Sequence, residues 1–329
     1  MDEVIHYIND RMDEVLAGKD ITRKEALRLL SLGRKEPFFL MAAADKIRRT
    51  FCGDKMDFCS DVNARSGRCT ENCKFCAQSG WYKTGVKEYP LRTPEFLTEQ
   101  AEKAEEYGAG RFGIVTSGRG QENKDQFESI VETVRDVRKK THLKVCCSLG
   151  LLTDEQLKEL KDAGVCRIHC NLETSERFFP QICTTHTWQE KAEHIRRIQK
   201  AGLDVCSGGI IGLGETEEDR IDMALSLRTF GIKSVPLNIF NPIPGTPFGA
   251  DRRPPNPLEI CRTFAVFRFI LPHAVMRVCA GREGALRDMQ AFALASGLNG
   301  AMIGGYLTIA GRPPQKDRQM ASDLGRELH

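Results

Sequence analysis

Long apolar runs are missing from this sequence, and none approaches the length that a membrane span requires. The hydrophobic share of 41% and the charged share of 28% are typical of a globular protein. The first residues carry acidic side chains throughout and lack the basic start and apolar core of a secretory signal. We therefore expect a cytoplasmic protein with no membrane partner.

An excess of one charge sign is missing too. The 48 basic and 45 acidic residues leave a net charge of +3, which creates no concentrated field for nucleic-acid binding. Nucleic acid is therefore not expected as a partner.

No long tract of proline, glycine or serine marks a linker, so we expect one main domain. An N-terminal helical stretch reaches to about Thr50. After it, short β-branched or apolar runs alternate with amphipathic helical segments, which is the pattern of βα units. This pattern predicts a helical extension over residues 1–50, a barrel over residues 51–311 and a C-terminal tail over residues 312–329.

The predicted strands indicate the fold class. They cover residues 56–62, 111–116, 143–149, 166–172, 204–210, 235–240, 275–279 and 300–303. Helices are expected over residues 94–107, 124–139, 154–163, 188–201 and 217–230, several of them after a capping residue such as Thr153, Thr187 or Thr216. Eight strands with intervening helices predict an α/β protein with a (βα)8 TIM-type barrel.

Cysteine is what the sequence has in abundance. Thirteen cysteines are many for a reducing compartment, where disulfides are rare and an excess more often indicates metal or redox chemistry. Some, such as Cys52 and Cys261, are expected to be small core residues, because cysteine packs well in apolar interiors.

Three of these cysteines form the sharpest motif, in which Cys69, Cys73 and Cys76 follow the first strand. A [4Fe-4S] cluster has four irons, so three thiolates leave one iron free to bind a small molecule. The loop also falls at the C-terminal face of the predicted barrel, where such folds place their chemistry. A structural zinc site fits less well, because no clean second CxxC or HxxxH follows nearby.

The motif and its surroundings resemble the biotin synthases, a family of radical S-adenosylmethionine (SAM) enzymes. The matching segments are DFCSDVNARSGR before the triad, AQSGWYKTGVKEYP after it, and then NLETS (171–175), TTHT (184–187), CSGGIIGLGET (206–216), NPIPGTP (241–247), GRE (281–283) and YLTIAG (306–311). Together they cover nearly everything from about Ala43 to about Gly311.

The resemblance implies a SAM site. The triad would hold a [4Fe-4S] cluster whose open iron binds the amino and carboxylate groups of SAM. Asn171 and Glu173 match positions that bind the SAM ribose, Ile210 a position beside the adenine, and Lys191 a cation for the SAM carboxylate. Ile210 is also readily explained as a core residue.

The resemblance also implies an auxiliary iron-sulfur cluster inside the barrel. Cys146, Cys206 and Arg277 match three of its family ligands, but the fourth position is Gly113, which cannot ligate anything. Cys279 lies two residues beyond Arg277, so it should face the same interior and replace the missing thiol. Cys147, Cys166 and Cys170 are expected to be packing residues.

Three thiolates on three strands favour a four-iron auxiliary cluster, whose open iron could carry the sulfide that is inserted. The alternatives are a [2Fe-2S] cluster with Arg277 as fourth ligand, and Cys279 as a core residue only.

For the substrate, Asn238 matches a position that contacts a cyclic urea, His169 replaces the asparagine usual at its position, and Thr308 is a candidate for the substrate tail. The resemblance implies conversion of dethiobiotin to biotin, with a reducing electron donor such as flavodoxin or ferredoxin, and a homodimer. The alternatives are a hydrogenase-maturation or methylornithine-forming radical SAM enzyme, an iron-sulfur carrier, or a zinc-dependent binding module.

Overall fold

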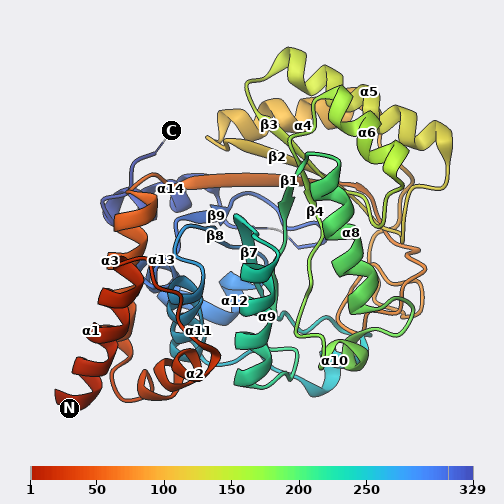
Figure 1. Ribbon diagram of the computed structural model, residues 1–329. Coiled ribbons are helices and arrows are strands. Elements are labelled where there is room, and N and C mark those ends of the chain that lie inside the picture. Colours follow the sequence, from red (N-terminus) through yellow and green to blue (C-terminus); the bar gives the residue numbers. More distant parts are fainter. Residues whose placement is uncertain (1, 310, 329) are drawn as a thin grey trace.

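The strands of this protein form the wall of a barrel. The computed structural model describes residues 2–309 and 311–328, and these residues form nine parallel strands in one sheet (Figure 1). The strands are β1 (Asp57–Arg65), β2 (Arg111–Thr116), β3 (Lys144–Ser148), β4 (Arg167–His169), β5 (Asp204–Cys206), β6 (Gly209–Ile211), β7 (Ser234–Ile239), β8 (Val275–Val278) and β9 (Gly300–Met302). Their order is β5-β4-β3-β2-β1-β9-β8-β7-β6, and an additional β5–β7 pairing closes the ring. The predicted TIM-type (βα)8 barrel is thus confirmed.

Two predicted strands differ clearly. The strand expected over residues 166–172 is formed only over Arg167–His169. The strand expected over residues 204–210 is divided into β5 and β6, with Ser207 and Gly208 between them. The break lies beside Pro236 of β7, which has no N–H for the ladder. The backbones also come close there, since a Cβ on Gly208 would lie 1.9 Å from the Pro236 carbonyl oxygen.

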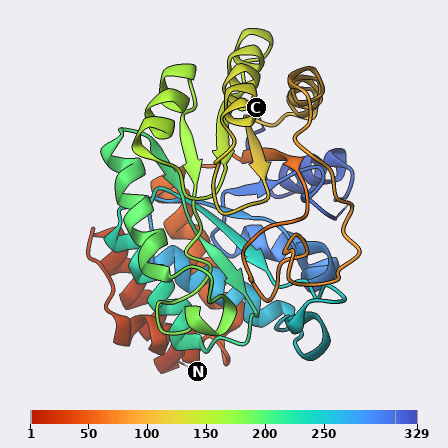
Figure 2. The same ribbon diagram turned by 90° about the vertical axis from the view of Figure 1, so that its right-hand side faces the viewer.

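Helices surround the strands (Figure 2). The main ones are α4 (Pro94–Glu106), α5 (Lys124–Lys140), α6 (Asp154–Ala163), α8 (Trp188–Lys200), α9 (Glu217–Thr229) and α11 (Pro257–Ile270), with the shorter α7 (Phe179–Ile182), α10 (Pro247–Asp251), α12 (Arg282–Leu286), η1 (Arg287–Met289) and α13 (Gln290–Ala295). Thr153, Thr187 and Thr216 each cap the start of a helix, as the sequence predicts, and the structure shows that each forms a capping box. Each box pairs two N-terminal N–H groups with side-chain oxygens, which fixes where the helix begins.

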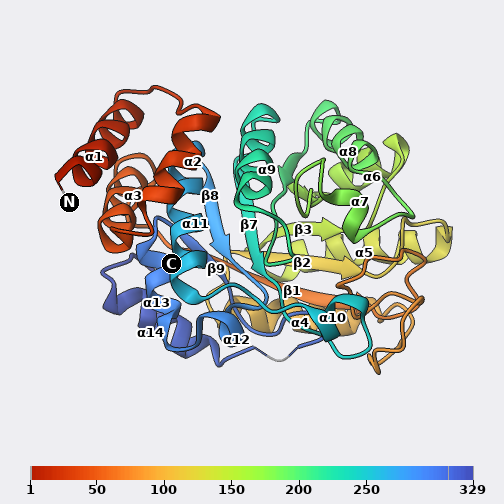
Figure 3. The same cartoon turned by 90° about the horizontal axis from the view of Figure 1, so that it is seen from below.

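The N-terminal extension consists of α1 (Asp2–Leu16), α2 (Arg23–Leu32) and α3 (Pro37–Cys52), which lie together beside α9 and α11 (Figure 3). Arg262 of α11 donates to the Leu30 carbonyl oxygen at 2.9 Å. These contacts attach the extension to the barrel.

The segment expected to be a C-terminal tail contains the helix α14 (Pro314–Asp323). Its Asp317 accepts a hydrogen bond at 2.6 Å from Arg282, and both side chains are buried. Further along, Arg326 contacts Asp45 of α3 at 2.8 Å, so the two ends of the chain meet on one side of the barrel. No helix of the described residues is long and apolar enough to cross a membrane.

Candidate active site

The triad loop leaves β1 at the C-terminal mouth of the barrel and is held in shape by its own backbone. The Cys69 N–H donates to the Gln78 carbonyl oxygen at 3.0 Å, and the Gly80 N–H donates back to the Cys69 carbonyl oxygen at 2.8 Å. The Gln78 side chain accepts from the Gly67 N–H at 3.2 Å. These bonds return the chain after Cys76 to its start, so Cys69, Cys73 and Cys76 share one short loop.

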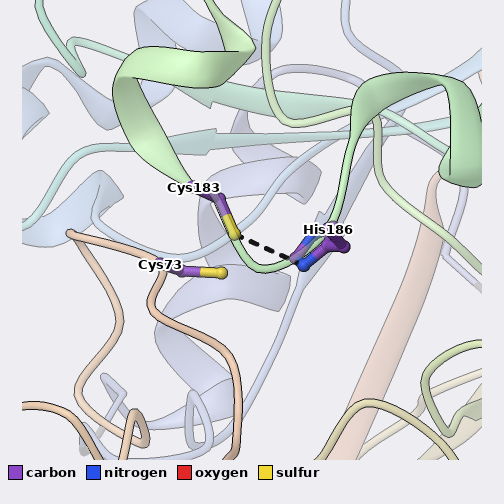
Figure 4. A group of neighbouring side chains, drawn as sticks. All are labelled: Cys73, Cys183 and His186. Carbon is purple, nitrogen blue, oxygen red and sulfur yellow. Dashed lines mark hydrogen bonds between the residues drawn. The ribbon is translucent and has the colours of Figure 1, made fainter.

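A second segment docks against this loop. The Lys74 N–H donates to the Ile182 carbonyl oxygen at 2.9 Å, and the Asn72 side chain bonds the Thr184 backbone N–H at 2.9 Å. As a result, Cys183 and His186 lie beside Cys73, with their ligating atoms within 4.8 Å of one another (Figure 4).

This group of three was missed by the sequence reasoning, although the Cys183-x-x-His186 spacing was there to be read. Cys183 lies 3.3 Å from His186 Nδ1, and a hydrogen bond between Cys73 and Cys183 raises the pKa of Cys73. His186 Nδ1 in turn contacts Glu71. A metal bound by these three residues would take Cys73 from the triad, so the two arrangements exclude each other.

Below the loop lies one cavity of about 440 Å³, within the range of small-molecule sites. It is lined by one triad residue, Cys76, and by every other predicted site residue: Cys146, His169, Asn171, Glu173, Lys191, Cys206, Ile210, Asn238, Arg277, Cys279 and Thr308. Residues that lie far apart in the sequence thus share a single cavity. It extends from the triad to the floor of the barrel, by which we mean its end at Cys146, Cys206, Arg277 and Cys279.

The residues predicted for SAM sit where β4 and β6 meet. The side-chain oxygen Oδ1 of Asn171 accepts from the Gly208 N–H at 2.9 Å, and its side-chain amide donates to the Glu173 carboxylate at 3.2 Å. Glu173 has a φ of 67°, an unusual backbone conformation for a non-glycine residue that is often found at functional sites. Its carbonyl oxygen accepts from the Ile210 N–H at 2.9 Å, which fixes the two residues beside each other.

Lys191 reaches the cavity from α8. Burial alone would lower the pKa of Lys191, but neighbouring groups, chiefly Cys170 and Glu173, raise it overall. The ammonium group therefore stays charged beside an acidic partner, as an anion-binding role requires.

The floor of the cavity holds thiols around one buried arginine. Cys146 lies on β3, Cys206 ends β5 and Cys279 follows β8. Arg277 donates from Nε to Asp57 at 2.7 Å and from Nη1 to the Ser234 hydroxyl at 2.7 Å.

The burial and the hydrogen bonds of Arg277 indicate whether the floor suits an iron-sulfur cluster. Arg277 is 2% exposed, and its Nη2 has no hydrogen-bond partner among the residues that the structure describes. A buried donor without a partner is costly, so a further acceptor is expected in the cavity. Arg111 and Arg167 also line the cavity and add positive charge, and an anionic cluster held by thiolates matches both the charge and the free donor.

The thiols differ in their electrostatics. Burial would raise the pKa of Cys206, but the hydrogen bond with His169 and the charges of His169 and Arg277 lower it to about 7. Burial raises the pKa of Cys279, which favours the neutral thiol there in the absence of a cation. Metal binding reverses this preference, because the ligand form of cysteine is the thiolate.

The structure also places residues in the floor that the sequence reasoning did not single out. Cys59 and Asp61 of β1 both line the cavity, and the same two-residue parity that selected Cys279 would have found them. Cys166, expected to be a packing residue, is hydrogen-bonded with Cys146, and this bond raises the pKa of Cys146. Cys147 belongs to the hydrophobic core, in line with the prediction, and also borders the cavity.

The residues predicted for the substrate also line the cavity. The side-chain oxygen Oδ1 of Asn238 accepts from the Ala280 N–H at 3.1 Å, so its side-chain N–H groups remain largely available, with one long contact of 3.5 Å to the Gly209 carbonyl oxygen. His169 ends β4 and Thr308 lies in the loop after β9. All three residues line the same cavity.

Comparison with known proteins decides between the related families. The model of the Radical SAM superfamily matches residues 64–227, and that of the Biotin and Thiamin Synthesis associated domain matches residues 236–327. A biotin synthase of Pelotomaculum thermopropionicum is 46% identical over 96% of this chain and 98% of its own length. Another, of Heliobacterium modesticaldum, is 47% identical over 96% of both chains. The chain belongs to the biotin synthase family.

Solved structures agree on the fold of this biotin synthase family member. A methylornithine synthase has a TM-score of 0.84 over 97% of both chains, at 19% identity. The hydrogenase maturase of Carboxydothermus hydrogenoformans has a TM-score of 0.79 over 97% of this chain and 78% of its own, at 15% identity. At such identities the likeness concerns the barrel alone, so the rival families suggested by the sequence share the architecture.

Proposed function

We propose that this enzyme converts dethiobiotin to biotin by removing one hydrogen from each of two saturated carbons and inserting one sulfur between them. The observation that carries the proposal is the single cavity that runs from Cys76 of the triad to Cys146, Cys206 and Cys279 in the floor. When bound, the triad cluster and SAM supply a 5′-deoxyadenosyl radical, which suits C–H bonds that offer no acidic proton.

In this proposal Cys69, Cys73 and Cys76 bind the [4Fe-4S] cluster. Asn171 and Glu173 orient the SAM ribose, because their amide and carboxylate groups can pair with a diol. Ile210 covers the adenine, and Lys191 neutralises the SAM carboxylate.

The substrate would occupy the space below SAM. The largely available amide N–H groups of Asn238 donate to the urea carbonyl, His169 provides a second polar contact from the end of β4, and Thr308 contacts the tail. Asn238 is held in place by its bond from Ala280, so it meets the substrate in one orientation.

For the auxiliary cluster we propose four irons bound by Cys146, Cys206 and Cys279, with Arg277 beside them as a charge partner. The contacts of Arg277 support this choice over direct ligation. Two of its nitrogens are already bonded to Asp57 and Ser234, and burial, which would lower its pKa, is outweighed by the negative groups around it, foremost Asp57. A guanidinium that is kept protonated has no lone pair for iron.

The proposal also covers the location, the oligomeric state, the electron donor and the domain division of the protein. We infer a cytoplasmic homodimer that receives electrons from flavodoxin or ferredoxin and binds no nucleic acid. We also keep the division into a helical extension (1–50), a barrel (51–311) and a C-terminal segment (312–329), supported by the position of α1–α3 outside the strands.

The test is anaerobic reconstitution followed by reduction with SAM and dethiobiotin. Two 5′-deoxyadenosine molecules should form for each biotin, because each radical removes one hydrogen. Cleavage of SAM without biotin would point to a related radical SAM enzyme with another substrate. A cluster-loaded protein that cleaves no SAM would point to an iron-sulfur carrier.

A further inference from the structure

A second group of metal-binding side chains shares one residue with the triad. It consists of Cys73 in the triad loop and of Cys183 and His186 in the segment between α7 and α8 (Figure 4). Cysteine sulfur and imidazole nitrogen are the donors that Zn²⁺ prefers in proteins. The group therefore has the chemistry of a zinc site.

The three donor atoms already lie close together. They are within 4.8 Å of one another, and Cys183 Sγ is 3.3 Å from His186 Nδ1. In a tetrahedral zinc site, the usual Zn–S and Zn–N bond lengths place the donor atoms roughly 3.3–3.8 Å apart. Small movements of the side chains would therefore complete the geometry.

Asn72 holds the two halves of the group beside each other. Its Oδ1 accepts from the backbone N–H of Thr184 at 2.9 Å and from that of Thr185 at 3.3 Å. Its Nδ2 donates to the Thr184 hydroxyl at 2.7 Å. Because Cys73 directly follows Asn72 and Cys183 directly precedes Thr184, these bonds bring the two thiols together before any ion binds.

Glu71 is placed to supply a fourth ligand. It is buried, contacts His186 Nδ1 and accepts from the Thr185 hydroxyl at 2.7 Å. A carboxylate oxygen is an accepted zinc ligand, and structural zinc sites are almost always four-coordinate. Cys183 is 2% and His186 9% exposed, whereas Cys73 is only half-buried, so an ion can enter past Cys73.

We propose that the cluster-free enzyme binds one Zn²⁺ through Cys73, Cys183 and His186, with the Glu71 carboxylate as fourth ligand, and that this ion blocks assembly of the triad cluster. Each cysteine releases its proton to solvent and donates an electron pair to the metal, and neutral His186 donates the lone pair of Nδ1. Ligation therefore needs no oxidant or reductant.

The block follows from the sharing of Cys73. While zinc holds this thiolate, only Cys69 and Cys76 remain, and two thiolates do not replace the three that hold the cubane. This part of the inference rests on the triad cluster of the proposed function, whereas the zinc site itself does not.

Two other arrangements compete with the proposal. Zinc could be bound by Cys69, Cys73 and Cys76 of the triad itself, without the docked segment. Alternatively, Cys183 and His186 only fasten that segment to the loop and bind no ion. The three arrangements differ in which substitutions remove zinc.

The experiment uses the full-length chain, freed of iron by a chelator under anaerobic reducing conditions and then titrated with Zn²⁺ alone. Bound zinc per chain is measured after gel filtration, and affinity by competition with a colorimetric chelator. Zinc held by other thiols, such as those of the floor, is common to the proteins compared and cancels in the difference. The proteins are the parent, Cys73→Ala, Cys183→Ser, His186→Gln, Cys69→Ala and the matched control Cys261→Ala, which changes a fully buried thiol in α11.

Cys73→Ala, Cys183→Ser and His186→Gln should each lose one Zn²⁺ per chain, or bind it at least about 100-fold more weakly. A residue that merely orients a metal ligand already contributes about 10–100-fold to affinity, so loss of a ligand should cost at least as much. Cys69→Ala and Cys261→Ala should keep the zinc of the parent. Circular dichroism checks the fold, and His186→Gln gives a separate test if Cys183→Ser does not fold.

Loss of the same zinc in Cys69→Ala would place the ion on the triad and overturn the inference. Zinc binding equal to that of the parent in both Cys183→Ser and His186→Gln would also overturn it.

The block is tested by adding iron and sulfide to zinc-loaded and zinc-free protein. The triad cluster is recognised by the change of its electron paramagnetic resonance spectrum when SAM is added. Zinc should suppress this cluster in the parent but not in Cys183→Ser, and equal cluster formation in zinc-loaded and zinc-free parent would refute the block. If zinc-free Cys69→Ala formed the same cluster as the parent, the triad assignment of the proposed function would fail instead, while the zinc result would stand.

Discussion

The clearest quantitative prediction concerns Gly113 of β2, which lies in register with Asp61 of β1. A Cβ added at Gly113 would lie 2.1 Å from Asp61 Oδ1, 2.9 Å from Cγ and 3.7 Å from Cβ. The first two distances are too short for a real contact, while the third is an ordinary one. The clash therefore belongs to the carboxylate of Asp61 alone.

Gly113→Ala should consequently lower the free energy of unfolding by about 1–3 kcal/mol, the usual cost of overpacking a core. In an Asp61→Ala background the same change should be neutral or stabilising by about 0.4–1 kcal/mol, because only the Cβ of residue 61 remains nearby and glycine loses more entropy on folding. The two substitutions should thus couple by roughly 1–4 kcal/mol.

The assay is anaerobic urea unfolding of the parent, the two single variants and the double variant, followed by circular dichroism. Additivity within about 0.5 kcal/mol would refute the reasoning, because distant or independent sites behave in that way. It would mean that Asp61 moves aside at no cost.

Three further predictions follow from particular contacts. Asp317→Asn should lower the free energy of unfolding by about 3–5 kcal/mol, because it leaves the fully buried Arg282 without its carboxylate; an unchanged urea midpoint would contradict this. Burial lowers the pKa of His194 to about 4 in the folded protein, so the unfolded chain takes up a proton first as the pH falls. The free energy of unfolding should therefore decrease between about pH 6.5 and pH 4, by up to about 3 kcal/mol. His194→Gln should remove this part of the pH dependence, and equal acid sensitivity of the two proteins would exclude it. Replacing Cys69 or Cys76 by Ala should abolish 5′-deoxyadenosine formation while Cys147→Ala keeps it, as measured by chromatography after reduction with SAM.

Much of the site was readable from the sequence because its signals are local. The spacing of Cys69, Cys73 and Cys76 needs no tertiary contact to be recognised, and the capping boxes at Thr153, Thr187 and Thr216 fix helix starts within four residues of chain. Strand parity likewise turned Arg277 and Cys279 to the same interior. The structure brings all the predicted residues apart from Cys69 and Cys73 to the lining of one cavity.

What the sequence alone could not decide depends on residues that meet only after folding. The break between β5 and β6 follows from Pro236 on a neighbouring strand, and the grouping of Cys73, Cys183 and His186 follows from a segment that docks on the triad loop. The contact of Arg277 with Asp57 depends on the register across β9 and on the space left by Gly300. Sequence periodicity fixes which side of a strand a residue faces, but only the closed barrel determines its height and its neighbours, because these are set by the pairing of strands far apart in the chain.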